Sequence, residues 1–326
     1  MHTGKSRSST TVTSLKCRGK RHHVYRDRRI PVLPELPKLV KRVRLPSVAL
    51  DERPANSGPF CYTDNMTSQS HISRDCDGAS PKNLQALYDM LLASRHCVAF
   101  TGAGVSTLSG IRDFRGKNGL YKTADADKIF DIDIFRQDPS FYYKMTKDFI
   151  YGLDDKKPSV VHKVLAELEK QGILKAIITQ NIDLLHQKAG SRRVIEIHGS
   201  PSLHHCPRCS WSMTFSEVAA IVRAGDIPRC KKCDAVLKPD ITFFGESLPA
   251  EALAEAIEEA RSADLLLVLG STLLVYPAAT LPEYTLEHGG RLVIVNDMAT
   301  HLDAAASLRF SDLGSVFDFL AKKLKS

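Results

Sequence analysis

The stretch that decides the fold is Cys97-Val-Ala-Phe-Thr-Gly-Ala-Gly-Val-Ser106, where an apolar run leads directly into a glycine-rich turn. Residues 97–100 are predicted to form a short buried strand. Glycines after a strand allow backbone N–H groups to approach a phosphate, and the dipole of the next helix favours the anion. Thr107 stands where a dinucleotide-binding turn has its third glycine. Taken alone, such a turn is more often a packing turn than a phosphate site.

Outward from this turn, helix-like and strand-like segments alternate along the chain. We expect helices over residues 83–92, 160–171 and 249–262, strands over 97–100, 176–179, 194–197, 241–244, 265–269 and 291–295, and a short strand with a helix over 310–324. This alternation predicts an α/β fold, a Rossmann-like parallel sheet with helices on both faces.

Two segments interrupt the alternation and are predicted to form a small helical and zinc-ribbon lobe, residues 121–157 and 201–239. The remaining segments form the large lobe, about residues 81–120, 158–200 and 240–326. Residues 1–80 are rich in Arg, Ser, Pro and Thr without an apolar period, which predicts a disordered basic leader. A basic tail, an organelle-targeting sequence and a start-site artefact all remain open as its origin.

The net charge of +8 does not belong to the folded body. Residues 1–50 hold 13 Lys and Arg against 2 Asp and Glu, residues 51–80 hold 2 against 5, and the two signs balance in the rest. We therefore expect no direct nucleic-acid binding by the body. Apolar runs such as residues 265–269 are too short to span a bilayer, so no membrane partner is expected.

Four of the eight cysteines form two Cys-x-x-Cys hooks, Cys206 with Cys209 and Cys230 with Cys233. The spacing between the hooks is that of a zinc ribbon, and four thiolates fill a tetrahedral shell. A filled shell leaves no position for substrate, so we expect one structural Zn²⁺. The other cysteines show no pairing pattern, which favours a reducing compartment, and we expect a cytoplasmic protein.

Polar clusters follow several of the predicted strands, at the edge where ligands bind in open α/β sheets. They are Thr179-Gln-Asn-Ile-Asp183, His198, Gly270-Ser-Thr272 and Asn296-Asp-Met298. Amide and carboxylate groups in near succession suit ribose hydroxyls and a carboxamide, although Thr179–Asp183 also reads as a helix cap. Together the clusters predict a crevice for a nucleotide larger than a single phosphate. His198 is a candidate general base, whereas His162, His186, His204 and His205 are expected to be structural.

In this order the motifs resemble those of the sirtuins, the family of NAD-dependent protein deacylases. The resemblance rests on residues 102–115, 179–183, 197–199, the two hooks, 243–246, 270–272 and 295–296, and it covers about residues 82–326. It is closest to bacterial-type members, whose Gly-Leu-Tyr-Lys block stands here at residues 119–122. It implies that NAD⁺ is a co-substrate, that an acetylated protein or peptide is the partner, and that zinc is bound by the four cysteines.

The resemblance also implies the roles of individual residues. His198 and Asn181 are the implied catalytic residues, as the base and the ribose-orienting group. The implied NAD-contacting residues are Gly102, Ala103, Gly104, Ser106, Thr107, Asp113, Phe114, Arg115, Tyr121, Gln180, Asn181, Ile182, Asp183, His198, Gly270, Ser271, Thr272, Asn296, Asp297 and Asp312. The implied substrate-binding residues, which pair with the peptide backbone, are Thr242, Phe243, Phe244, Gly245 and Glu246.

The implied activity is NAD-dependent protein-lysine deacetylation, in which acetyl passes from lysine to ADP-ribose and nicotinamide leaves. Two residues depart from the common family pattern: Arg112 replaces proline in the cofactor loop, and Thr242 replaces valine beside the acyl channel. Residues 127–133 lack the Tyr-x-x-Arg pair of desuccinylating members, so a short neutral acyl group is expected. Mono-ADP-ribosyl transfer and removal of other short acyl groups are the alternatives. A zinc-ribbon nucleic-acid module and an NAD-linked dehydrogenase are more distant ones.

Overall fold

The computed structural model describes residues 79–113, 119 and 126–325, without the side chains of residues 126 and 127. The predicted basic leader lies almost wholly outside these residues. A six-stranded parallel sheet has the order β3-β2-β1-β7-β8-β9. Its strands are β1 (Cys97–Thr101), β2 (Leu174–Thr179), β3 (Val194–Glu196), β7 (Leu265–Leu269), β8 (Arg291–Val295) and β9 (Leu308–Phe310). The chain order reverses between β1 and β7, which is the switch point where such sheets bind ligands.

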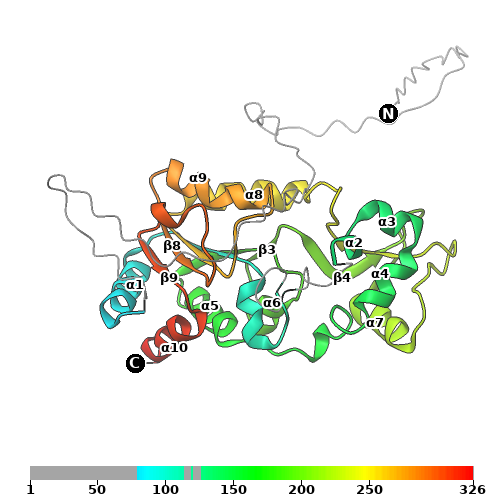
Figure 1. Cartoon of the computed structure of the whole chain (residues 1–326), viewed down its shortest axis with the longest axis horizontal. Helices are drawn as coiled ribbons and strands as arrows, with labels where there is room; N and C mark the ends of the chain where they lie inside the picture. The colour runs from blue at the N-terminus through cyan, green and yellow to red at the C-terminus, as the bar shows by residue number, and fades with distance from the viewer. Residues whose placement is uncertain (1–78, 114–118, 120–125, 326) are drawn as a thin grey trace, which may run out of the picture. The chain divides into compact units, whose positions relative to one another are not determined.

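Helices cover both faces of the sheet (Figure 1). One face packs against α1 (Pro81–Ala93), α5 (Val160–Lys170) and α10 (Leu313–Lys323), and the other against α8 (Ala250–Ser262) and α9 (Leu281–Glu287). All five residues of β1 and all five of β7 are buried, because side chains on both faces meet a helical layer. The sequence of such a central strand is a nearly continuous apolar run, and this pattern predicted both strands.

A second, three-stranded sheet has the order β5-β4-β6 and is antiparallel. Its strands are β4 (Gly199–His205), β5 (Ser212–Thr214) and β6 (Lys238–Ile241). It shares a core with α2 (Ala126–Ile129), α3 (Ile132–Gln137), α4 (Pro139–Thr146) and α7 (Phe215–Ala224). This core is aromatic: the rings of Phe135 and Phe243 meet edge to face with centroids 5.3 Å apart. The helical and cysteine-containing segments thus lie together in one small lobe (Figure 1).

The strand predicted over residues 241–244 is wrong in its position along the sequence. The strand β6 covers Lys238–Ile241, and the chain leaves the sheet before Thr242. The apolar run misled because Phe243 is fully buried in the small-lobe core without belonging to a strand. Phe244 instead exchanges backbone hydrogen bonds with residues 130 and 132, at 2.7 and 3.1 Å. The segment 242–246 is therefore an irregular chain held between the two lobes.

The remaining short elements lie at the ends of strands and helices. They are α6 (Leu185–Ala189) and the 3₁₀ turns η1 (Ala103–Ser109), η3 (Leu153–Asp155), η4 (Ala278–Thr280) and η5 (Asp303–Ala305). The helix expected after Asp183 is α6, and Asp183 Oδ1 accepts the backbone N–H of Leu185 at its start. Among the described residues, no helix is both long and apolar enough to cross a membrane.

Candidate active site

The loops after the parallel strands are tied to one another by backbone hydrogen bonds that continue the sheet ladder. Gly102 donates to Leu269, Gln180 to Thr101, Ile197 to Thr179, Gly270 to Val295, and Asn296 to Phe310, all at 2.9–3.1 Å. Each loop is therefore placed by its neighbour strand. The sequence predicted that these polar clusters would converge at one edge, and they do.

A cavity of about 280 Å³ opens at this edge and reaches the small lobe. Most of the predicted site residues line it: Gly102, Ala103, Gly104, Ser106, Asp113, Gln180, Asn181, Ile182, Asp183, His198, Thr242, Phe244, Gly270, Ser271, Thr272, Asn296 and Asp297. The wall mixes apolar side chains with a few converging polar groups, the usual composition of a small-molecule site.

The glycine-rich turn packs tightly against the loop that follows β7. A Cβ atom on Gly104 would lie 2.6 Å from Gly270 Cα, and one on Gly102 would lie 2.7 Å from the Gly270 carbonyl oxygen. These glycines are thus required for the close approach of two strand-end loops. The packing interpretation and the cofactor interpretation of the turn are compatible, because the same loops line the cavity.

A buried polar network joins the turn to the Thr179–Asp183 segment. Ser106 Oγ donates to Asp183 Oδ2 at 2.5 Å, and Asn181 Nδ2 donates to the Gly102 carbonyl at 3.1 Å and to Ser106 Oγ at 3.3 Å. The Asn181 amide protons are thereby committed, which leaves its Oδ1 as the atom able to accept a bond from a ligand. Asn181 and Asp183 are both at least nine-tenths buried, so the network is shielded from bulk water.

The position of the proton on His198 follows from its hydrogen bond. Nδ1 lies 2.9 Å from the carbonyl oxygen of Gln180, which can only accept, so Nδ1 carries the hydrogen. Nε2 is then a bare acceptor, buried and without a partner among the described residues. Burial lowers the pKa of His198 and the Gln180 carbonyl partly offsets this, so the ring is neutral near pH 7. His198 lines the cavity, and a neutral imidazole whose Nε2 is unpaired can take a proton from a ligand.

Several predicted site residues do not line the cavity. Thr107 points its hydroxyl at the Gly104 carbonyl, at 2.8 Å, and the Asp312 side chain caps the start of α10. Phe243 is buried in the small-lobe core, while Gly245 and Glu246 continue the segment beyond the cavity. Phe114, Arg115 and Tyr121 lie outside the described residues.

The cavity also has walls that sequence reasoning missed. They include Phe130, Asp148, Phe149, Ile150, Leu153, Lys156, Leu274 and Val275, while Ile111, Arg112 and Met298 also line the cavity and belong to motifs that the sequence analysis named without assigning these three to the site. Lys156 Nζ donates to the Gly110 carbonyl at 3.1 Å, which ties the end of η1 to the small-lobe side. The interrupted alternation predicts that residues 121–157 are an insertion. No spacing of residues within that segment indicates that it forms a wall of the cavity. Leu274 was detectable, because it follows the Gly270-Ser-Thr272 cluster by two residues.

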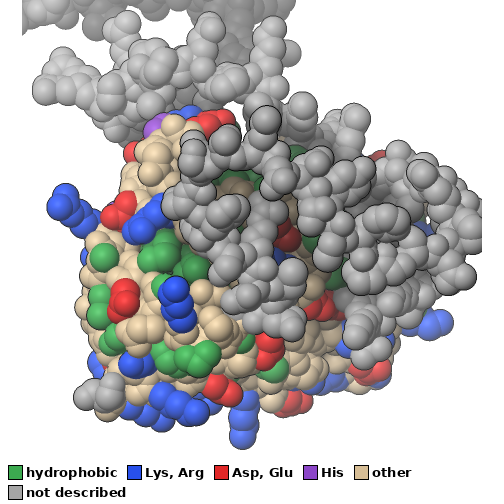
Figure 2. Space-filling view, turned by 60° about the vertical axis from the view of Figure 1, so that its left-hand side comes forward, with side chains coloured by type: hydrophobic (Ala, Val, Ile, Leu, Met, Phe, Trp, Pro, Cys, Tyr) green, Lys and Arg blue, Asp and Glu red, His purple; other side chains and the backbone are tan. Residues whose placement is uncertain are grey.

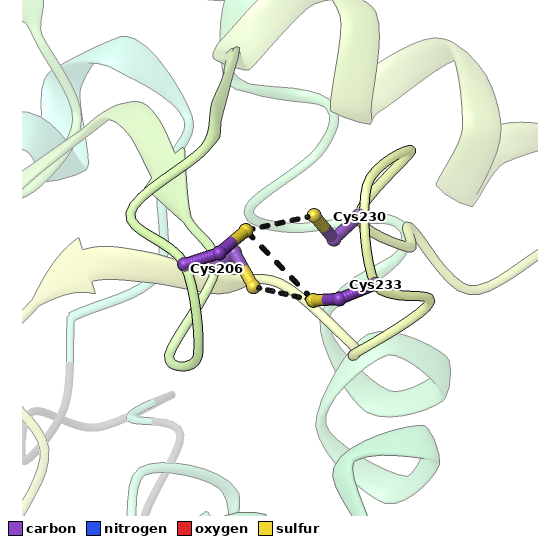
Figure 3. A group of neighbouring side chains, drawn as sticks. Cys206, Cys230 and Cys233 are labelled. Atoms are coloured by element: carbon purple, nitrogen blue, oxygen red, sulfur yellow. Dashed lines mark hydrogen bonds between the residues drawn. The ribbon is translucent and has the colours of Figure 1, made fainter.

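The four hook cysteines lie in one cluster, on two loops whose sulfur atoms face each other (Figure 3). The Sγ atoms of Cys206 and Cys233 are 3.4 Å apart, as are those of Cys209 and Cys230, and all four lie within 4.8 Å of one another. Tetrahedral zinc with bonds of about 2.3 Å places its sulfurs at just such separations. The cluster fits one structural Zn²⁺, and none of its four cysteines is among the residues that line the cavity.

Comparisons with known proteins agree on one family. The Sir2 family model matches residues 102–277. An NAD-dependent protein deacetylase of Thermotoga maritima is 46% identical over 228 residues, 70% of this chain and 92% of the relative. An NAD-dependent protein deacylase of Archaeoglobus fulgidus is 41% identical, over 73% of this chain and 94% of the relative.

Solved structures agree as well. A Sir2 structure with a p53 peptide and NAD⁺ is 42% identical, has a TM-score of 0.68 and covers 74% of this chain and 97% of its own. A Sir2 structure bound to an acetylated peptide covers the same shares with a TM-score of 0.67. With the switch-point cavity, the neutral histidine and the four-cysteine cluster already in place, these matches show that the chain belongs to the Sir2 family, the sirtuins.

Proposed function

We propose that this protein is an NAD-dependent protein-lysine deacetylase. The observation that carries the proposal is His198, a residue of the cavity wall whose Nδ1 hydrogen is held by the Gln180 carbonyl and whose buried Nε2 has no partner among the described residues. NAD⁺ supplies the ribose that receives the acetyl group and the nicotinamide that leaves. His198 Nε2 accepts the proton of a ribose hydroxyl, which makes that hydroxyl a better nucleophile toward the acyl carbon.

The nicotinamide end of the cofactor is assigned to the buried network of Ser106, Asn181 and Asp183. Asp183 already accepts from Ser106 Oγ and has carboxylate capacity left for an amide N–H, while Asn181 Oδ1 is free to accept. Gln180, Ser271 and Asn296 are assigned to the ribose and phosphate portions, since they line the same cavity at neighbouring strand ends.

The substrate peptide is assigned to the outer edge of segment 242–246. Phe244 uses both its N–H and its C=O toward residues 130–132, whereas exposed Gly245 makes no backbone hydrogen bond with the described residues. An extended peptide can add to such an open edge. Leu274, 43% exposed beside the cavity, provides an apolar surface for its side chains.

A short neutral acyl group is the proposed substrate, acetyl first. The cavity that His198 lines is also lined by Ile241, Thr242, Phe244 and Val275, which suit a small apolar chain. Thr242 adds one hydroxyl to this channel, for which the described residues provide no hydrogen-bond partner.

The deciding experiment measures nicotinamide release from NAD⁺ with purified, zinc-loaded protein, with and without an acetyl-lysine peptide. We expect release that depends on the peptide, and a peptide mass lower by one acetyl group. A peptide that gains the mass of ADP-ribose instead would assign mono-ADP-ribosyl transfer. Absence of peptide-dependent release in metal-loaded, folded protein would refute both.

We also propose a reducing, cytoplasmic setting and no nucleic-acid partner for the folded body. Every cysteine in the described part of the chain is a free thiol, and four of the five form the metal cluster. On the face drawn in Figure 2, Lys and Arg side chains are interspersed with Asp and Glu. Residues 81–326 carry balanced charge, so we expect them to leave DNA unbound in a gel-shift assay even at low salt.

A further inference from the structure

The stretch Phe243-Phe-Gly-Glu246 folds into a tight turn. The backbone N–H of Glu246 donates to the Phe243 carbonyl at 3.0 Å, and Gly245, the third residue of the turn, has a φ of 93°. A type II turn requires a positive φ at this position. A Cβ atom on Gly245 would also lie 2.8 Å from Ile132 Cγ2, so the turn depends on glycine for both conformation and space.

The Glu246 carboxylate points back into this turn. Its Oε2 accepts the backbone N–H of Phe243 at 2.9 Å and pairs with Lys238 Nζ, also at 2.9 Å. The side chain thus closes the turn a second time, beside the backbone bond. The Lys238 and Glu246 side chains are 20% and 27% exposed, and a pair so sheltered from solvent is screened less than a pair on the open surface.

The Lys238 ammonium group connects the turn to strand β6. Nζ donates to the carbonyl oxygens of Pro239 and Ile241, at 3.2 and 2.8 Å. Its third proton goes to Glu246 Oε2, so all three donors of the ammonium are used within the chain. Nζ also lies 4.4 Å from the centroid of the buried Phe243 ring, within the range of a cation–π interaction.

We propose that Lys238 and Glu246 form a clasp that holds the 243–246 turn in the conformation to which the substrate peptide binds. The role rests on the proposed function, because it concerns the edge assigned there to the peptide. Gly245, whose backbone groups make no hydrogen bond with the described residues, lies between the two residues that the carboxylate joins. A turn that is ordered before the peptide arrives loses less conformational entropy on binding.

The clasp acts on the peptide edge and not on the cofactor. Neither Lys238 nor Glu246 lines the cavity assigned to NAD⁺. The neighbouring residue Thr242 is held separately, by its backbone N–H on the His198 carbonyl at 2.8 Å. Loss of the clasp should therefore loosen the turn without displacing the base. Lys238 and Glu246 act through the backbone of the turn, so they are positioning residues.

The test uses the full chain, loaded with zinc, and the variants Lys238→Met, Glu246→Gln and both together. Glu246→Gln keeps an acceptor for the Phe243 N–H and removes the charge. Arg136→Met is the matched control, because it removes a small-lobe cation whose pair with Asp133, at 3.0 Å, has side chains 68% and 76% exposed. Peptide affinity is measured by fluorescence anisotropy with a labelled acetyl-lysine peptide, NAD⁺ affinity by calorimetry, and kcat, peptide KM and melting temperature on the same preparations.

We expect Lys238→Met to weaken peptide binding about tenfold and to raise the peptide KM equally, with kcat within threefold and NAD⁺ affinity within twofold of wild type. Glu246→Gln should weaken peptide binding about fivefold, because only the charge is lost. The double variant should lose about tenfold, far less than fiftyfold, because all three variants remove the same ion pair. Arg136→Met should leave every one of these values within twofold.

Unchanged peptide affinity in folded Lys238→Met would overturn the clasp, as would a double variant with fully additive loss. Arg136→Met with a loss as large as that of Lys238→Met would overturn it too, because any lost cation of the small lobe would then have the effect. If Lys238→Met does not fold, Glu246→Gln decides by the same measurement, and unchanged peptide affinity there overturns the clasp. A wild-type protein without peptide-dependent nicotinamide release would refute the proposed function itself, whereas an active wild type with unaffected variants refutes only the clasp.

Discussion

The chemistry of the site depends on which nitrogen of His198 carries the proton. Because the Gln180 carbonyl holds the hydrogen on Nδ1, only Nε2 can act as a base. His198→Gln removes the base, and we expect kcat to fall about a thousandfold, within the range of general-base contributions. The NAD⁺ dissociation constant and the melting temperature should change little, since Nε2 has no partner among the described residues.

That prediction is checked by turnover and calorimetry on the same preparation. A His198→Gln protein that deacetylates within tenfold of wild type would show that another group takes the proton. Loss of NAD⁺ binding together with turnover would instead indicate that the histidine holds the cofactor.

Thr242 is the single residue on which we expect acyl preference to depend. Its backbone N–H donates to the His198 carbonyl at 2.8 Å, and it lines the cavity beside the base. Thr242→Val is nearly isosteric and replaces a hydroxyl by a methyl group in an apolar channel. We expect kcat/KM for butyryl-lysine relative to acetyl-lysine to rise about fivefold, which corresponds to about 1 kcal/mol. An unchanged ratio across both peptides would remove Thr242 as a determinant.

Among the elements, the central strands were predictable and the connecting segments were not. Residues 97–100 and 265–269 are apolar throughout because both faces of the sheet are covered, so pattern and structure agree within a residue. The run at 241–244 misled because Phe243 is buried by the small lobe and not by a sheet. A short apolar run reports burial, and burial alone does not distinguish a strand from an irregular chain.

The candidate site likewise has residues that the sequence predicts and residues that it does not. Ser106, Asn181, Asp183 and His198 follow strands and were identified, since strand ends meet at one edge. The Asp148 and Lys156 walls come from the inserted helical segment, whose path over the cavity depends on tertiary packing. The tautomer of His198 was also beyond sequence reasoning, because it depends on a carbonyl eighteen positions earlier in the chain.

The two Cys-x-x-Cys hooks are the element on which the small lobe depends. They connect the chain after β4 to the chain before β6, and Cys206 and Cys230 are buried in the small-lobe core. Cys206→Ala leaves three ligands, so we expect loss of zinc, a melting temperature lower by at least 10 °C and loss of turnover. Metal analysis, calorimetry and the deacetylation assay check these three outcomes.

Cys97→Ala is the matched control, because it removes a buried thiol of β1 that is not part of the four-cysteine cluster. This variant should retain one zinc per chain and its activity. A Cys206→Ala protein that remains folded and active would contradict the structural role of the metal.

At the scale of the whole molecule, burial of neutral histidines makes stability depend on pH. Burial, as the largest cause, lowers the pKa of both His186 and His204 from 6.5 to about 3. Below about pH 6.5 these histidines bind protons in the unfolded chain but stay neutral in the folded protein. The free energy of unfolding therefore falls as the pH drops, and it continues to fall to about pH 3. Each such histidine contributes about 1.4 kcal/mol between pH 7.5 and 5.5. Glu196, whose pKa is raised mainly by burial, acts in the opposite direction.

Urea unfolding at pH 7.5 and 5.5 should therefore show a loss of at least about 2–3 kcal/mol for the wild type, the share of His186 and His204, to which the buried His162 and His198 add in the same direction because burial lowers their pKa as well. His204→Gln should lose about 1.4 kcal/mol less over the same interval. His288→Gln, which changes an exposed histidine of the large lobe, should match the wild type.

Because acid also protonates zinc-bound thiolates, zinc content is measured at each pH and only metal-loaded samples are compared. Equal pH dependence in His204→Gln and the wild type would show that His204 titrates in the folded protein as it does in the unfolded chain. That outcome would contradict its assignment as a neutral buried partner of Tyr151.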